Sequence, residues 1–148
     1  MRTQRLKIPR AAGGNRQQRL PFDCVAVILA GVIQLPRILL VEDDDGVRVL
    51  MEHVLIGDGY EVDPAPTIAA ARTLIGRKRY DLVLADGVLP DGSGIQIAEE
   101  ADRRGIPAMI VTAYAFRFPK RDLAHYTLLL KPVRPAELLE AVKRELAR

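Results

Sequence analysis

The sequence predicts an α/β protein with a doubly wound, five-stranded parallel sheet. Short apolar runs alternate along the chain with segments that have the apolar period of a helix, about 3.6 residues. The connections between these segments are short. Polar groups also stand directly after several of the runs. Ligands of such sheets bind beyond the carboxyl ends of the strands, so these polar groups are candidates for a functional site.

Five apolar runs are the predicted strands. The first is rich in leucine and β-branched residues, which is typical of a strand buried on both faces. The second is the weakest of the five. In chain order, the predicted strands are Arg37–Val41, Tyr60–Ala65, Asp81–Ala85, Ala108–Thr112 and Leu128–Leu130.

The segment after the first strand is predicted to be an amphipathic helix. Asp44 or Asp45 can cap its N-terminus, and Gly57 or Gly59 can end it. Its apolar positions follow the i, i+3, i+4 spacing of one helix face. They are Val47, Leu50, Met51, Val54 and Leu55.

Three further helices follow. Thr67 can cap the second helix, and the third is predicted over Gly94–Arg104, where Gly105 stops it. Pro135 suits the first turn of the last helix, because a proline there gives up no intrahelical hydrogen bond.

Residues 1–36 are predicted to be an extension outside the domain that residues 37–148 form. The first part lacks apolar periodicity, which is typical of disorder. Residues 25–35 form an apolar run that is shorter than the roughly 20 residues of a membrane span. The sequence favours a disordered or adventitious extension over an extra element packed on the domain, or over a segment for targeting or membrane contact.

The basic charge of the chain belongs to this extension. The net charge is +3, but residues 1–24 carry six Lys and Arg against one Asp. The rest of the chain is slightly acidic, so no direct contact with nucleic acid is expected. The single cysteine, Cys24, excludes an internal disulfide and a cysteine-based zinc site.

Acids, a hydroxyl and a lysine follow successive predicted strands. Parallel strands bring these groups to one edge of the sheet, where clustered carboxylates repel one another unless a cation binds. Mg²⁺ prefers such oxygen ligands. Each residue alone has an ordinary role as a cap, turn or strand residue, but the ordered set predicts a site for phosphoryl transfer. The set is Glu42, Asp43, Asp44 and Asp45, then Asp86, Thr112 and Lys131.

This order and spacing resemble the receiver domain of two-component response regulators. The resemblance covers residues 37–148 and implies a flavodoxin-like sheet with strand order 2-1-3-4-5. It also implies a cytoplasmic, Mg²⁺-dependent phosphoacceptor. The stretches that carry it are Ile38–Asp44, Asp81–Asp86, Leu89–Gly94, Val111–Ala113 and Leu130–Pro132.

The resemblance implies a metal site and an acceptor. Asp86 aligns with the phosphorylated aspartate, a carboxylate nucleophile. Glu42 and Asp43 align with the metal-binding acidic pair. Asp86 and the backbone carbonyl of Val88 complete the implied protein ligands of Mg²⁺.

Two further residues align with groups that contact the phosphoryl group. Thr112 aligns with the hydroxyl residue, and Lys131 aligns with the lysine that pairs with the acceptor. The bond between Lys131 and Pro132 is usually cis in this family.

The sequence departs from the family pattern beyond the fourth strand. Leu128 stands where the family often has an aromatic switch residue, so Tyr114 or Tyr126 are the candidates to replace it. The segment 113–126 is short and contains Pro119, which predicts a short or irregular helix.

The leading prediction is a single-domain response regulator and not an enzyme in the usual sense. Its expected partners are a sensor histidine kinase or a histidine phosphotransfer protein. A downstream protein is expected on the face formed by the fourth and fifth strands and the last helix. One alternative is a degenerate receiver, against which the intact site residues argue. The other is a Mg²⁺-dependent aspartyl phosphatase, which needs a second acid where Gly87 and Val88 stand.

Overall fold

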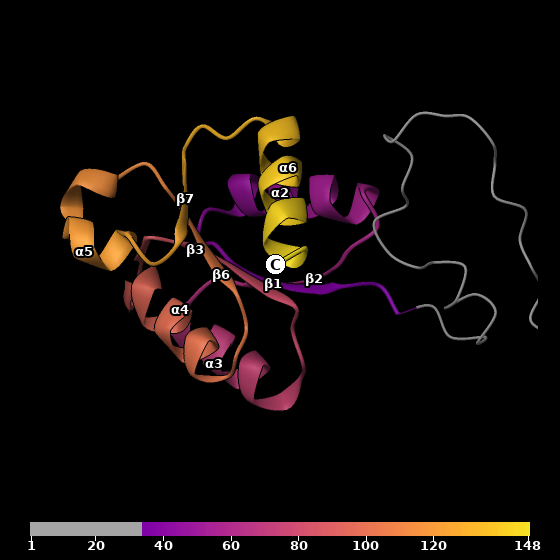
Figure 1. Ribbon diagram of the computed structural model, residues 1–148, viewed down its shortest axis with the longest axis horizontal. Coiled ribbons are helices and arrows are strands. Elements are labelled where there is room, and N and C mark those ends of the chain that lie inside the picture. Colours follow the sequence, from indigo (N-terminus) through magenta and orange to yellow (C-terminus); the bar gives the residue numbers. More distant parts are fainter. Residues whose placement is uncertain (1–33) are drawn as a thin grey trace, which may run out of the picture. The chain divides into compact units, whose positions relative to one another are not determined.

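The computed structural model describes residues 34–148, which form a five-stranded parallel sheet with helices on both faces (Figure 1). The strand order is β2-β1-β3-β6-β7, which is 2-1-3-4-5 when only the predicted strands are counted. The predicted fold class and order are therefore confirmed. The predicted extension lies almost wholly outside the described residues. The strands are β1 (Arg37–Val41), β2 (Glu61–Ala65), β3 (Leu82–Asp86), β6 (Ala108–Thr112) and β7 (Thr127–Leu130).

Two helices cover each face of the sheet. Helices α2 (Asp45–Gly57) and α6 (Pro135–Leu146) lie on one face, and α3 (Ile68–Arg77) and α4 (Gly94–Arg103) lie on the other (Figure 1). Within residues 34–148, no helix is long and apolar enough to cross a membrane.

The connection between β6 and β7 is irregular, as Pro119 predicts. It contains a 3-10 turn, η2 (Ala115–Arg117), and a one-turn helix, α5 (Lys120–Leu123). A second feature was not predicted: β4 (Val88–Leu89) and β5 (Gly92–Ser93) form a small antiparallel hairpin after β3.

The apolar runs become strands because helices cover them on both sides. All five residues of β3 and of β6 are buried, as a central parallel strand requires. In contrast, β2 contains Pro64, which has no backbone N–H for the ladder. It lies at the edge of the sheet, where that loss is tolerated.

Helix α2 departs from the predicted apolar stripe. Met51 and Leu55, one turn apart, are buried, but Leu50 is 59% exposed. Leu50 lies about 100° around the helix from Met51, so a helix that presents Met51 to the sheet turns Leu50 to solvent. The predicted cap is confirmed, since Asp44 accepts from the backbone N–H of Val47 at 2.9 Å.

The N-terminus of α3 is held by two side chains. Thr67 accepts from the N–H of Ala70, as predicted. Asp91, from the turn between β4 and β5, accepts from the N–H groups of Ile68 and Ala69 at 2.9 and 3.0 Å. These backbone hydrogen bonds lower the pKa of the Asp91 carboxyl, because they stabilise its charged form. The loop that follows β3 is thereby anchored to a neighbouring helix.

Candidate functional site

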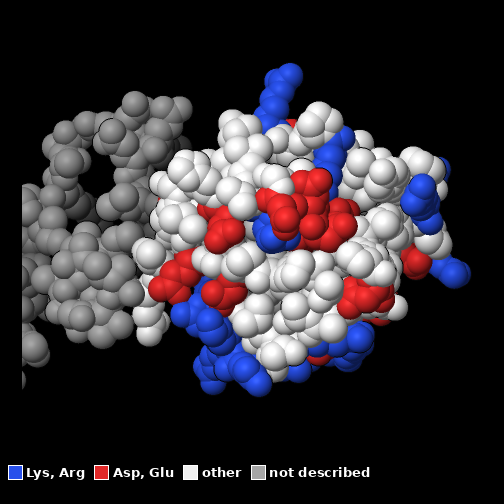
Figure 2. All heavy atoms as spheres, turned by 180° about the vertical axis from the view of Figure 1, so that it is seen from behind, with Lys and Arg blue, Asp and Glu red and all other residues white. Residues whose placement is uncertain are grey.

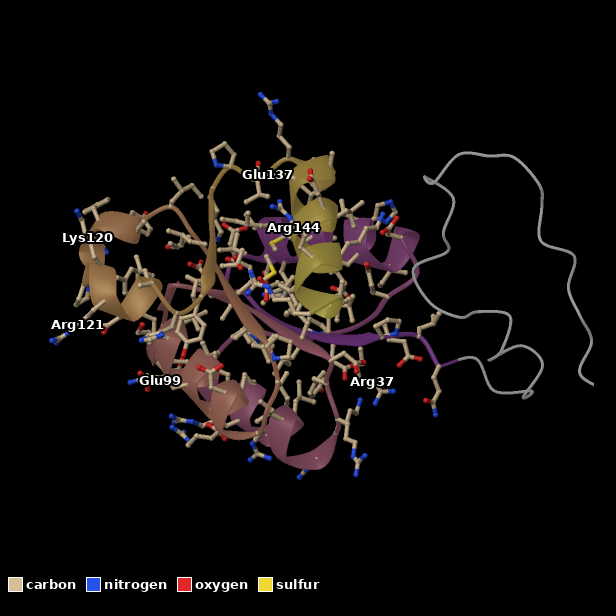
Figure 3. The ribbon with its side chains drawn as sticks, in the orientation of Figure 1. Arg37, Glu99, Lys120, Arg121, Glu137 and Arg144 are labelled. Carbon is tan, nitrogen blue, oxygen red and sulfur yellow. The ribbon has the colours of Figure 1, made fainter. Side chains whose placement is uncertain are left out.

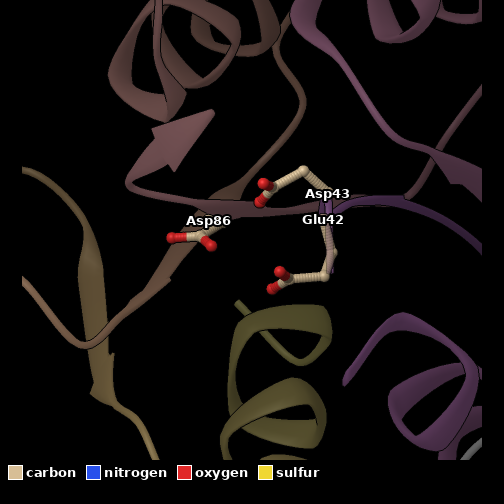
Figure 4. Close-up of side chains that lie close together, drawn as sticks. All are labelled: Glu42, Asp43 and Asp86. Atoms are coloured by element: carbon tan, nitrogen blue, oxygen red, sulfur yellow. The ribbon is translucent and has the colours of Figure 1, made fainter. Parts of the chain in front are cut away.

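Three carboxylates meet at the carboxyl edge of the sheet. Glu42 follows β1 and Asp86 ends β3, and the parallel register that pairs Val41 with Ala85 brings the two acids side by side. With Asp43, each offers an oxygen within 4.8 Å of the others (Figure 4). Glu42 and Asp86 are 1% and 8% exposed, so their charges are largely withdrawn from water.

A lysine bridges two of these carboxylates. Lys131 follows β7, and its Nζ lies 2.5 Å from an oxygen of Glu42 and 2.9 Å from Oδ2 of Asp86. The backbone N–H of Lys131 donates to the carbonyl of Thr112 at 3.1 Å, which fixes the start of the turn. The Lys131–Pro132 bond is cis, as the resemblance implies.

Burial and neighbouring charges both act on the pKa values of Glu42 and Lys131. Burial raises the pKa of Glu42, and the negative charge of Asp86 adds to that rise while Lys131 opposes it. Burial lowers the pKa of Lys131, but its hydrogen bonds to Glu42 and Asp86 outweigh this and the net pKa is raised. Lys131 is therefore a fixed positive charge at neutral pH.

Thr112 lies one strand away from Asp86. It ends β6, where the register places Val111 opposite Asp86, and it is fully buried. Its hydroxyl oxygen accepts from the N–H of Tyr114 at 3.1 Å. Asp86 itself accepts from the N–H of Val88 through Oδ1 at 3.2 Å. The structure thus brings Glu42, Asp43, Asp86 and Lys131 together and places Thr112 and Val88 at the same edge, whereas Asp44 caps α2 and Asp45 pairs with Arg48.

The donor set fits a hard divalent cation. Three carboxylates in reach of one point supply oxygen ligands and more negative charge than one lysine balances. Figure 2 shows acidic side chains gathered in one patch, with basic groups beside it. Glu42, Asp43 and Asp86 would hold Mg²⁺, which would neutralise charge on an incoming phosphoryl group.

Gly94 shapes the loop after Asp86 through a close approach that the sequence does not predict. A Cβ at this position would lie 1.9 Å from the carbonyl oxygen of Asp86 and 2.8 Å from its carbonyl carbon. The N–H of Gly94 donates to the carbonyl of Gly87 at 3.0 Å. The first turn of α4 therefore packs closely against the backbone of Asp86. The sequence Gly92-Ser93-Gly94 is a signal for such a close approach. A turn into α4 accounts for the same glycines equally well, so the signal is not specific.

Comparisons with known proteins agree with this geometry. Residues 38–143 match the family of response regulator receiver domains. The chain is 31% identical over 115 residues to sporulation initiation phosphotransferase F of Bacillus subtilis, covering 74% of this chain and 93% of that protein. It is 32% identical over 123 residues to the DNA-binding response regulator MtrA of Mycolicibacterium smegmatis, covering 76% of this chain. The chain spans only 51% of the length of that regulator.

Solved structures that resemble this chain include receiver domains and response regulators. A CheY-like receiver domain from Methanospirillum hungatei is 33% identical, with a TM-score of 0.70, and the match covers 77% of this chain and 95% of that one. Response regulator TrrA from Thermotoga maritima, solved in complex with Mg²⁺ and BeF, is 29% identical with a TM-score of 0.69. That match covers 75% of this chain and 99% of the other.

Proposed function

The chain belongs to the receiver domain family of response regulators, and we propose that it accepts a phosphoryl group on Asp86 in a Mg²⁺-dependent reaction. Receiver domains are signalling phosphoacceptors rather than enzymes in the usual sense. The observation that carries the proposal is Lys131, which joins Asp86 to Glu42 beside a third carboxylate. The similarity of this chain to the B. subtilis phosphotransferase supports a role in phosphoryl transfer. We propose that the chain works as a single-domain response regulator in the cytoplasm, by protein contact or phosphorelay.

In the proposed reaction an oxygen of Asp86 attacks the phosphorus of a donor. An O–P bond forms, the bond from phosphorus to the donor's leaving atom breaks, and the leaving atom keeps the electron pair. Lys131 then pairs with a phosphoryl oxygen, and the hydroxyl of Thr112 donates to another. Glu42, Asp43, Asp86 and the carbonyl of Val88 would hold Mg²⁺, which would supply positive charge to the phosphoryl oxygens.

The proposed donors are a sensor histidine kinase or a histidine phosphotransfer protein. The proposed output surface is the face of β6, β7 and α6, on which Leu130 is 56% exposed. No direct nucleic-acid contact is part of the proposal.

Removal of the metal tests this proposal against both rivals. Incubation with acetyl phosphate and Mg²⁺ is expected to add one phosphoryl group to the protein, and excess chelator is expected to prevent the addition. Intact mass measures both. A degenerate receiver would show no mass change with either treatment. An aspartyl phosphatase would instead hydrolyse p-nitrophenyl phosphate through many turnovers.

The phosphorylated protein is expected to be long-lived. Hydrolysis needs a water in line with the O–P bond, and in the family its approach is bordered by the positions of Val88 and Tyr114. Neither side chain is an acid or amide that could hold this water. The ring of Tyr114, 42% exposed, instead has the guanidinium of Arg117 at 4.5 Å from its centroid.

Val88→Asn and Tyr114→Glu are expected to speed the decay about tenfold, the effect of one added hydrogen bond of about 1.4 kcal/mol to the attacking water. The measurement is the loss of the phosphorylated mass after the donor is removed. Fast decay of the wild type, or unchanged decay in both variants, would refute this explanation of lifetime.

A further inference from the structure

Gly87, the residue directly after the acceptor, leaves room for an aromatic ring. A Cβ at Gly87 would lie 2.8 and 2.9 Å from Cε2 and Cζ of Phe118 and 3.0 Å from Cβ of Thr112. The φ angle of Gly87 is not positive, so its backbone conformation does not demand glycine. The ring of Phe118 is what requires glycine here, because it fills the space that a side chain at position 87 would occupy. Thr112 borders the same space.

The ring therefore fills a space that two groups near Asp86 border. One is the peptide after Asp86, where the N–H of Val88 donates to the acceptor carboxylate at 3.2 Å. The other is the side of Thr112, whose hydroxyl would turn toward the new oxygens. Phe118 is partly buried and packs against the core beneath α3 and α4, so a shift at either place changes its surroundings.

The same residue is tied to an exposed aromatic group. The N–H of Phe118 donates to the carbonyl of Ala115 at 3.2 Å, and the N–H of Arg117 donates to the carbonyl of Tyr114 at 2.9 Å. This turn holds Phe116, 81% exposed, with its ring centroid 6.3 Å from that of Tyr114. We call Tyr114, Phe116 and Arg117 the turn cluster.

Basic side chains continue outward from the turn cluster. Lys120 and Arg121 extend from α5 away from the sheet (Figure 3). Lys120 follows Phe118 by two residues, so a movement of Phe118 would be passed along the backbone to this surface.

The other candidates for an internal switch are engaged elsewhere. The hydroxyl of Tyr126 donates to Asp102 on α4 at 2.7 Å. Tyr114 faces Arg117 at the surface, and Leu128 lies on β7 against the core. Among these residues and Phe118, only Phe118 is placed against the acceptor loop.

We propose that Phe118 is the positioning residue that couples the acceptor to the turn cluster. This inference rests on the proposed phosphorylation of Asp86. The phosphoryl group turns Thr112, the ring of Phe118 moves into or out of the space over Gly87, and the turn that contains the cluster follows. Phe118 forms no bond with the phosphoryl group and acts only through Gly87 and Thr112.

A tryptophan probe tests the coupling, because the chain contains no tryptophan. Phe118→Trp places the fluorophore against the acceptor loop, and Phe116→Trp places one on the exposed side of the same turn as a matched control. Each is treated with acetyl phosphate and Mg²⁺, and intact mass reports labelling in the same sample. The emission of Phe118→Trp is expected to shift on labelling. Phe116 is 81% exposed, so a tryptophan there stays in water when the turn moves and its emission is expected to stay unchanged. Phe118→Trp that also carries Asp86→Asn is expected to show no shift.

A labelled Phe118→Trp protein with unchanged emission would overturn the coupling while leaving the phosphoacceptor intact. Unlabelled wild type would overturn the proposed function instead. Should the tryptophan variant not fold, the amide chemical shifts of residues 114–118 provide the second measurement. They are expected to move on labelling of wild type and Phe118→Tyr, and to stay fixed in labelled Phe118→Leu. Equal movement in Phe118→Leu would also contradict the coupling.

Discussion

Gly94→Ala is expected to lower the free energy of unfolding by roughly 3 kcal/mol or more, the range of severe packing defects. The new methyl group would lie 1.9 Å from the carbonyl oxygen of Asp86, far inside van der Waals contact. The obstacle is backbone, so no side-chain rotation relieves it. Either α4 or the acceptor strand must move, and movement of the strand displaces the carboxylate from Lys131. Urea unfolding measures the stability, and acetyl phosphate labelling is expected to slow with it.

Gly76→Ala is the matched control, because Gly76 lies within α3 and a Cβ there would meet nothing within 4 Å. This variant is expected to gain about 0.5–1 kcal/mol, since alanine loses less backbone entropy than glycine in a helix. Equal stability of the two variants would contradict the contact assigned to Gly94.

Asp43→Ala is expected to abolish Mg²⁺-dependent labelling while the fold is retained. Asp43 offers an oxygen to the point that Glu42 and Asp86 also reach, but it is the exposed member of the three. Its removal leaves no buried group without a partner, and it relieves repulsion among the carboxylates. The free energy of unfolding without metal is therefore expected to stay equal or rise.

Asp45→Ala provides the comparison, since Asp45 lies in the same acidic run but its side chain is 87% exposed and pairs with Arg48. An exposed ion pair of this kind contributes about 1 kcal/mol or less. Labelling of Asp45→Ala is expected to match wild type. Undiminished labelling of Asp43→Ala would contradict the metal assignment.

The sequence predicts the candidate site best where a residue's chemistry and its place at the end of a strand point to the same position. Strand ends of a parallel sheet share one edge, so the positions of Glu42, Asp86 and Lys131 could be predicted to meet from their order alone. The cap at Asp44 and the irregular segment around Pro119 followed from local rules. These features depend on residue type at a fixed place in a local pattern.

The features that the sequence did not predict depend on distant contacts. Periodicity alone cannot choose which flank of an apolar stripe faces the sheet, and Leu50 lies on the flank turned to solvent. Gly94 and Gly87 admit a backbone carbonyl and a ring that come from elsewhere in the chain. Phe118 lies against Gly87 because the short connection after β6 folds back. No pattern of residue spacing in the sequence predicts this contact.

Phosphorylation of Asp86 is the central claim, and intact mass after incubation with acetyl phosphate and Mg²⁺ tests it most directly. The wild type and Asp45→Asn, which changes an exposed acid, are each expected to gain one phosphoryl group. Asp86→Asn is expected to gain none, because its amide cannot act as the nucleophile. The same gain in Asp86→Asn as in wild type, or no gain in wild type, would contradict the claim.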